Sequence, residues 1–201
     1  RSKFTGLAQI CEWIPPFLVG KLARQHGVDA LARAFSPWSH VVALLDAQLV
    51  HPISLNDVCD GLRLHAAKLF RLRGAVAPSR NGLSHANKVR PAAMAEELFW
   101  TVLGHLTTLR PRFGGRTYSG MPRRFKRLIH VVDATTIQLV ANCIDWARHR
   151  RKKAAAKMHL RLNLRSFLPA FAVVDTARLH DAAAARRVCA GIGRGEIVVF
   201  D

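Results

Sequence analysis

The sequence is short of acidic residues, and this shortage is its clearest compositional feature. Its 201 residues include 13 Asp and Glu against 31 Lys and Arg, which gives a net charge of +18 and an isoelectric point near 11.4. Such an imbalance indicates a polyanionic partner, most often a nucleic acid. An anionic membrane surface is the weaker alternative.

Clustered cysteines, metal-protease motifs and long apolar runs are also missing. The four cysteines are far apart and form no C-x-x-C pair, which argues against a zinc finger and predicts reduced residues in the core. No H-x-x-x-H motif has an adjacent Glu, so a zinc protease is not expected. The longest apolar run, residues 41–50, is interrupted by Asp46 and is too short to span a bilayer. With no signal peptide visible, we expect a cytoplasmic protein, and the start at Arg1 suggests a fragment.

Residues 1–110 are expected to be helical. Ser36 followed by Pro37 predicts a helix start, and Ser54 with Asp57 forms a capping box before a helix that extends to Leu69 with a weak point at Gly61. A short helix is expected over residues 79–90, after a turn marked by Gly and Pro. Two helices around such a turn suggest a helix-turn-helix, in which the second helix contacts DNA.

The segment 79–90 is rich in side chains that donate to phosphates or base edges. A solvated helix face is the alternative interpretation. The candidate DNA-contacting residues here are Arg80, Asn81, His85, Asn87 and Lys88.

Residues 111–126 are interpreted as a basic linker, and residues 127–201 as a second domain. In this domain two apolar, β-branched runs, 128–133 and 197–201, each end in an aspartate. Strands are expected at 158–165 and 170–175 between them, followed by a helix at 180–190. Asp133 and Asp201 would then end neighbouring strands, as two-metal phosphoryl transfer requires. The alternative is that each Asp simply favours a turn.

A dense basic run lies between the first two strands of this second domain. It is either a solvated loop or a set of phosphate contacts beside the carboxylates. The candidate DNA-contacting residues of this region are Arg148, Arg150, Arg151, Lys152, Lys153, Lys157 and His159.

Several of these motifs together resemble the transposases of bacterial insertion sequences, in the branch of insertion-sequence-4 type. The motifs are Val131-Val-Asp-Ala-Thr-Thr-Ile, the run Trp-Ala-x-x-Arg-x-x-Lys-x-Ala-x-Lys-x-His from Trp146 to His159, Leu179-His-Asp181 and the final Val-Phe-Asp201. Residues 4–108 resemble the helical N-terminal domain of such enzymes, through Phe4-x-x-Leu and Ser79-Arg-x-x-Leu-x-x-Ala-Asn87.

The resemblance implies an α+β chain in which a helix-turn-helix-like domain precedes a truncated RNase H-like DDE domain. It assigns Asp133 and Asp201 as the first two catalytic, metal-binding acids and implies two Mg²⁺ or Mn²⁺ ions in the complete enzyme. The implied substrate is the double-stranded DNA of insertion-sequence ends. The resemblance also implies a possible homodimer on paired ends and a cytoplasmic, nucleoid-associated location in a bacterium.

The third acid of the family lies in a Tyr-x-x-Arg-x-x-x-Glu signature that has no counterpart before Asp201. We therefore expect this chain to be inactive alone. A non-catalytic DNA-binding protein that occupies element ends and regulates transposition is the main alternative function. A generic RNase H-like nuclease acting on RNA or repair intermediates is a third.

Overall fold

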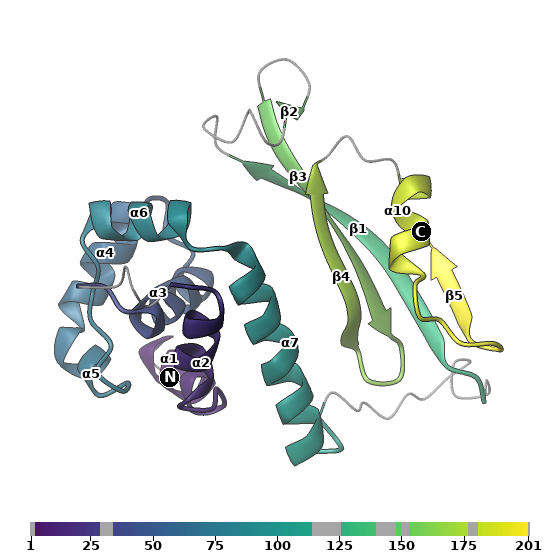
Figure 1. Cartoon of the computed structure of the whole chain (residues 1–201), viewed down its shortest axis with the longest axis horizontal. Coiled ribbons are helices and arrows are strands. Elements are labelled where there is room, and N and C mark those ends of the chain that lie inside the picture. The colour runs from purple at the N-terminus through teal and green to yellow at the C-terminus, as the bar shows by residue number, and fades with distance from the viewer. Residues whose placement is uncertain are drawn as a thin grey trace. The chain divides into compact units, whose positions relative to one another are not determined.

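The fold is mixed α+β and divides into two compact units, Arg1–Pro111 and Arg112–Asp201 (Figure 1). A computed structural model describes residues 3–28, 34–113, 126–139, 148–149, 153–176 and 181–200. Each unit is treated by itself below. No helix in these ranges is long and apolar enough to cross a membrane.

The first unit is helical, as the sequence predicts for residues 1–110. Its helices are α1 (Lys3–Glu12), α2 (Leu18–Gln25), α3 (Pro37–Val50), α4 (Leu55–Leu64), α5 (Ala66–Phe70), α6 (Arg80–Val89) and α7 (Ala92–Leu109).

Short polar side chains begin three of these helices, because each accepts a hydrogen bond from an otherwise unpaired N–H of the first turn. Ser36 Oγ accepts from the N–H of Ser39 at 3.0 Å, and Ser79 Oγ accepts from the N–H of Gly82 at 3.1 Å. At α4 both halves of the predicted capping box are present. The expected long helix is nevertheless divided: α4 ends at Leu64 and α5 begins at Ala66. The interruption is at His65, whose N–H bonds back to the carbonyl of Leu62, and not at the predicted Gly61.

Two apolar clusters hold the helical unit together, and α3 contributes to both. The first contains buried residues of α1, α3, α4, α5 and α6 and of the segment between α5 and α6, namely Leu7, Cys11, Val42, Ala43, Val58, Cys59, Leu62, Leu69, Ala75 and Leu83. The second joins α2 to α7 through Leu18, Val19, Leu22, Ala23, Met94 and Leu98, with Val41 and Leu45 of α3 packed against it. Cys11 and Cys59 are buried free thiols, as the sequence suggests, and burial raises the pKa of Cys11 to about 11.

The second unit contains one mixed sheet. Its strands are β1 (Ile129–Leu139), β2 (Arg148–His149), β3 (Lys153–Asn163), β4 (Leu168–Thr176) and β5 (Ile197–Phe200), with helix α10 (Asp181–Val188) between the last two. β3 pairs antiparallel with both β1 and β4, β5 pairs parallel with β1, and the short β2 pairs with the start of β3. The neighbours across the sheet are therefore β4, β3, β1 and β5.

Two strands are longer than the sequence patterns predict. β1 does not end at Asp133 but continues to Leu139, so Asp133 lies within the strand. The β-branched residues Thr135, Thr136 and Ile137 favour this extension. β3 correspondingly begins at Lys153, not at Met158, because its first residues pair with the extended part of β1.

Helix α10 covers one face of this sheet. Val132, Ala184 and Val188 form its small core, with Phe171, Val173 and Val198 packed around them. Apolar side chains of the opposite face are more open, since Ile137, Val174 and Val199 are 39%, 52% and 48% exposed.

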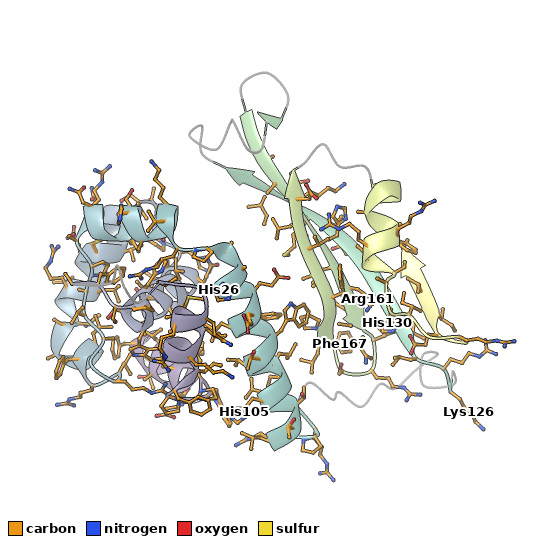
Figure 2. All side chains as sticks on the ribbon, viewed as in Figure 1. His26, His105, Lys126, His130, Arg161 and Phe167 are labelled. Carbon is orange, nitrogen blue, oxygen red and sulfur yellow. The ribbon has the colours of Figure 1, made fainter. Side chains whose placement is uncertain are left out.

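A buried arginine joins α10 to the sheet. Arg161, on β3, is 7% exposed and donates from Nη1 to the carbonyls of Val188 and Ala190, at 2.8 and 2.9 Å. These carbonyls belong to the C-terminal end of α10, where a cation also complements the helix dipole. The guanidinium lies over the Phe171 ring, 5.7 Å from its centroid. Figure 2 shows Arg161 on the sheet unit, together with His130.

A pair of leucines in α4 tests the helical core. Leu62 is 2% exposed and Leu64 is 84% exposed. Leu62→Ala should lower the free energy of unfolding of this unit by about 2–5 kcal/mol, because it leaves a cavity in the first cluster. Leu64→Ala, the matched control, should change it by less than about 0.5 kcal/mol. Urea denaturation followed by helical circular dichroism measures both, and equal effects would contradict the packing described here.

Candidate functional site

A pocket of about 200 Å³ opens where β1, β3, β5 and α10 meet. It collects three of the residues that the sequence singled out, Asp133, Lys157 and His159. The remaining lining residues are Val132, Ala134, Ala185, Val188 and Phe200.

The register of β1 with β3 explains this grouping. Ala134 lies opposite His159, and Thr136 lies opposite Lys157. Side chains alternate along a strand, so Lys157, His159 and Arg161 share one face, the face that α10 covers. Asp133 lies between Val132 and Ala134 and alternates with them, so its side chain starts on the other face of β1; the residue lines the pocket at this edge, and its Oδ1 accepts a hydrogen bond from the N–H of Ala134 at 2.7 Å. Asp133 is exposed, so this carboxylate can meet a ligand.

Lys157 and His159 differ in what they can contact. His159 is 2% exposed, so its ring suits a role in positioning neighbouring groups better than a direct phosphate contact. Lys157 is half-buried and lies opposite Asp175 in the pairing of β3 with β4. Asp175 also accepts a hydrogen bond from Nη1 of Arg187 on α10, at 2.9 Å. Lys157 thus brings positive charge to the pocket, next to the strand position of Asp175.

The parallel pairing of β5 with β1 bears on the two predicted catalytic aspartates. The last described pair of this register is Val132 with Phe200. Each of these residues is followed in the sequence by an aspartate, Asp133 and Asp201. Asp201 lies outside the described residues, so its side chain is not placed.

A metal site at this pocket would need the side chain of Asp201 as well as that of Asp133. Within the ranges that the structure describes, no three His, Cys, Asp or Glu side chains gather into a metal site. Asp133 offers an exposed carboxylate, the kind of ligand that Mg²⁺ and Mn²⁺ take, but one carboxylate does not hold such an ion.

Glu196, the acid nearest to Asp201 in the sequence, is engaged elsewhere. Its carboxylate accepts hydrogen bonds from the N–H of Gly193 and from Nε2 of His130, both at 3.1 Å. The bond from Gly193, followed by the contact with His130, lowers the pKa of Glu196 below its usual value. Glu196 precedes β5, whereas Phe200 ends it, so this carboxylate lies at the other end of the strand from the pocket.

The candidate DNA-contacting residues of the helical unit lie on α6. Leu83 and Ala86 face the core, while Arg80, Asn81, His85 and Lys88 are exposed. In a helix of 3.6 residues per turn, Asn81, His85 and Lys88 lie on the side opposite Leu83 and Ala86, where they can enter a groove.

Asn87 is the exception on this helix, because it already has a structural partner. Its Oδ1 is 2.7 Å from Nε2 of His40 on α3. His40 is 9% exposed, and burial lowers its pKa, which favours the neutral ring. Asn87 therefore joins α6 to α3.

The basic run is described only in part. The backbone of Arg148 belongs to β2 and that of Lys153 begins β3, and neither side chain is described. Arg150, Arg151 and Lys152 lie outside the described residues.

Arg161 is a residue next to the candidate site that the sequence interpretation missed. It continues the alternation of Lys157 and His159 along β3 and holds α10 against the pocket. The pattern Lys-x-His-x-Arg is the signal that could have identified it, since residues two apart on a strand share a face.

A mixed α+β protein is thus defined, with a helical unit and a sheet unit in the chain order β-β-β-β-α-β, and with Asp133, Lys157 and His159 on one pocket. Comparison with known families shows that residues 2–72 match the family model described as Domain of unknown function (DUF4372), a domain found in transposase-like proteins. Neither a curated protein nor a solved structure matches the chain.

The different roles of two asparagines on α6 can be tested by alanine substitution. Asn87→Ala should lower the free energy of unfolding by about 1–3 kcal/mol, because the buried His40 ring loses its hydrogen-bond partner. Asn81→Ala, on the exposed side of the same helix, should change stability by less than about 0.5 kcal/mol. Thermal denaturation of the two variants gives the comparison, and a stable Asn87→Ala protein would remove the structural role of this bond.

Proposed function

We propose that the chain is part of a DDE-type transposase of the insertion-sequence-4 type. In this proposal the helical unit binds the DNA of insertion-sequence ends, and the sheet unit belongs to a catalytic domain that cuts and joins DNA by two-metal phosphoryl transfer. The observation that carries it is the register of β5 with β1, which pairs Val132, the residue before Asp133, with Phe200, the residue before Asp201, at a pocket lined by Asp133, Lys157 and His159.

The topology of the sheet unit supports an RNase H-like fold. Three strands pair antiparallel in succession, a helix follows on one face, and the next strand returns parallel to the first. A parallel return of this kind needs a crossover, which α10 provides. This arrangement agrees with the domain that the motifs of the sequence resemble.

The family match in the N-terminal part of the chain supports the same class of protein, a transposase. The matched residues 2–72 include α1 to α5, and the matching domain is found in transposase-like proteins.

Three roles are proposed for the chain's own residues in phosphoryl transfer. Asp133 and Asp201 would supply oxygen ligands to Mg²⁺ or Mn²⁺, and His159 would help to fix the pocket wall beneath Asp133. Lys157 would place positive charge next to the phosphate that enters the pocket. Held by these residues, Mg²⁺ or Mn²⁺ would supply activation of the attacking oxygen and stabilisation of the leaving oxygen.

The DNA-binding part is proposed to be helix-turn-helix-like. Helix α6 packs on α4 and presents Asn81, His85 and Lys88 outward, as a helix that enters the major groove must. This exposed face also favours the second candidate function, a DNA-binding protein that occupies element ends without cutting them. A homodimer on paired ends and a cytoplasmic, nucleoid-associated location in a bacterium belong to the same proposal.

Manganese binding tests the catalytic proposal. Mn²⁺ titrated into the protein in the presence of duplex DNA, and followed by electron paramagnetic resonance, should bind at a site that includes Asp133. Asp133→Asn should weaken this binding by about tenfold or more, equivalent to about 1.4 kcal/mol. Asp175→Asn is the matched control, because its carboxylate already pairs with Arg187. Equal affinity in the parent and in Asp133→Asn would contradict the metal assignment and favour the non-catalytic function.

Sequence-dependent DNA binding tests the role of α6. Replacing Arg80 and Asn81 by Ala should cost about 1–3 kcal/mol for each base whose hydrogen bonds to the protein are removed, and should reduce the preference for element-end DNA over unrelated duplex. Fluorescence anisotropy with both duplexes measures affinity and preference together. A double variant that keeps the parent's preference would exclude these two residues from the DNA interface.

A further inference from the structure

Positive charge is concentrated in the sheet unit, away from the helix expected to read DNA. Residues 112–201 contain 18 Lys and Arg against 6 Asp and Glu, whereas residues 1–111 contain 13 against 7. The sheet unit therefore carries a net charge of +12 of the total +18.

Four exposed cations of this unit gather at the end of the sheet remote from the pocket. Lys126 and Arg127 precede β1, Arg165 follows β3 and Arg194 precedes β5. Because β3, β1 and β5 are neighbours in that order, the start of β1 lies between the other two segments. We call these four residues the strand-end patch, and Figure 2 labels Lys126 within it.

Hydrogen bonds fix the segments that carry the patch. Nη2 of Arg165 donates to the carbonyl of Lys126 at 3.0 Å. Backbone bonds link Leu164 to Ile129 and Ile197 to Leu128, each at 2.9 Å. Neighbouring strands lie about 4.7–4.9 Å apart, so three strand ends place the patch within about 10 Å across the sheet.

A tight turn sets the position of Arg194. The N–H of Glu196 bonds to the carbonyl of Gly193 at 3.2 Å, and Gly195 has a φ of +89°, which glycine adopts without strain. Glu196 is the acid of this turn, and its carboxylate is already bound by Gly193 and by the 5% exposed His130. Counted with this single carboxylate, the four cations of the patch still leave this end of the sheet with a net positive charge.

The patch and the pocket lie on the same strand. Arg127 lies two residues before β1 and Asp133 lies within it, so six residues at a strand rise of about 3.3 Å separate them by up to about 20 Å. In B-form DNA this distance corresponds to about six base pairs, at about 3.4 Å for each charge of one strand.

We propose that the strand-end patch binds the phosphate backbone of duplex DNA, about six base pairs from the phosphate that enters the pocket. This inference rests on the proposed function, which supplies DNA as the partner. The strand-end patch would be a second DNA-contacting surface, one that binds phosphates and does not read bases. Its role is to align the duplex along β1.

Salt dependence of binding by the whole chain tests the proposal. Affinity for a duplex of unrelated sequence is measured by anisotropy at several salt concentrations. Lys126, Arg127, Arg165 and Arg194 are replaced together by Gln in one variant. Each phosphate that the protein no longer neutralises lowers the slope of log affinity against log salt by about 0.9, so a decrease of about 3–4 units is expected. Arg165→Lys keeps its charge and should keep the parent's slope, whereas Arg165→Gln should lower the slope by about one unit.

The matched control removes the same charge from the helical unit. Lys21, Arg24, Lys68 and Arg71 are exposed and lie outside α6, and their joint replacement by Gln should lower the slope by less than about one unit. Circular dichroism checks that both fourfold variants remain folded. An unchanged slope in the patch variant, or equal decreases in both variants, would overturn the proposal. Loss of binding to phosphatidylserine vesicles without loss of DNA binding would also overturn it and assign the patch to a membrane surface.

The outcome is separable from that of the catalytic proposal. If the patch variant has a lower slope while Asp133→Asn retains Mn²⁺ affinity, the patch is supported and the metal assignment fails. If the patch variant keeps the parent's slope while Asp133→Asn loses Mn²⁺ affinity, the patch fails and the catalytic assignment is supported.

Discussion

The parallel pairing of β5 with β1 is the constraint on which the candidate site depends. A backbone bond from Ile197 to Leu128 sets the register, and four residues of β5 then run beside β1 as far as Phe200 and Val132. The register brings the chain back to β1 next to Asp133, although the two segments are more than 60 positions apart in the sequence. A shift of one residue would move every side chain of β5 to the other face, so burial of Val198 against α10 protects the register.

Helix α10 makes this pairing possible, and Arg161 holds the helix in place. Burying an arginine is costly unless its N–H groups find partners, and here two carbonyls at the end of α10 accept them. Val188 of the same helix is 1% exposed and lines the pocket with His159. The pocket is thus a consequence of packing between α10 and the sheet, and the ion pair of Arg187 with Asp175 joins α10 to β4 as well.

The sequence predicts the local features of this fold better than its long-range ones. Ser36, Ser54 and Ser79 are recognisable as helix starts because capping depends on residues three positions away. The ends of β1 and β3 are misplaced by local patterns because each strand is extended by pairing with the other. Asp133, Lys157 and His159, which the motifs single out, line one pocket, whereas the engagement of Asn87 by His40, 47 positions away, required the structure. The same holds for the strand-end patch, whose cations come from three separate segments.

The central claim is that Asp133, within β1, and Asp201, which follows Phe200 of β5 in the sequence, form one metal site. Crystals of the protein soaked in Mn²⁺, with data collected at a wavelength where manganese scatters anomalously, test it most directly. The account predicts an anomalous peak at the pocket, within about 2.0–2.3 Å of an oxygen of each carboxylate, as hard divalent ions require. A peak bound by other residues, or a pocket in which the two carboxylates point away from each other with no ion between them, would contradict it.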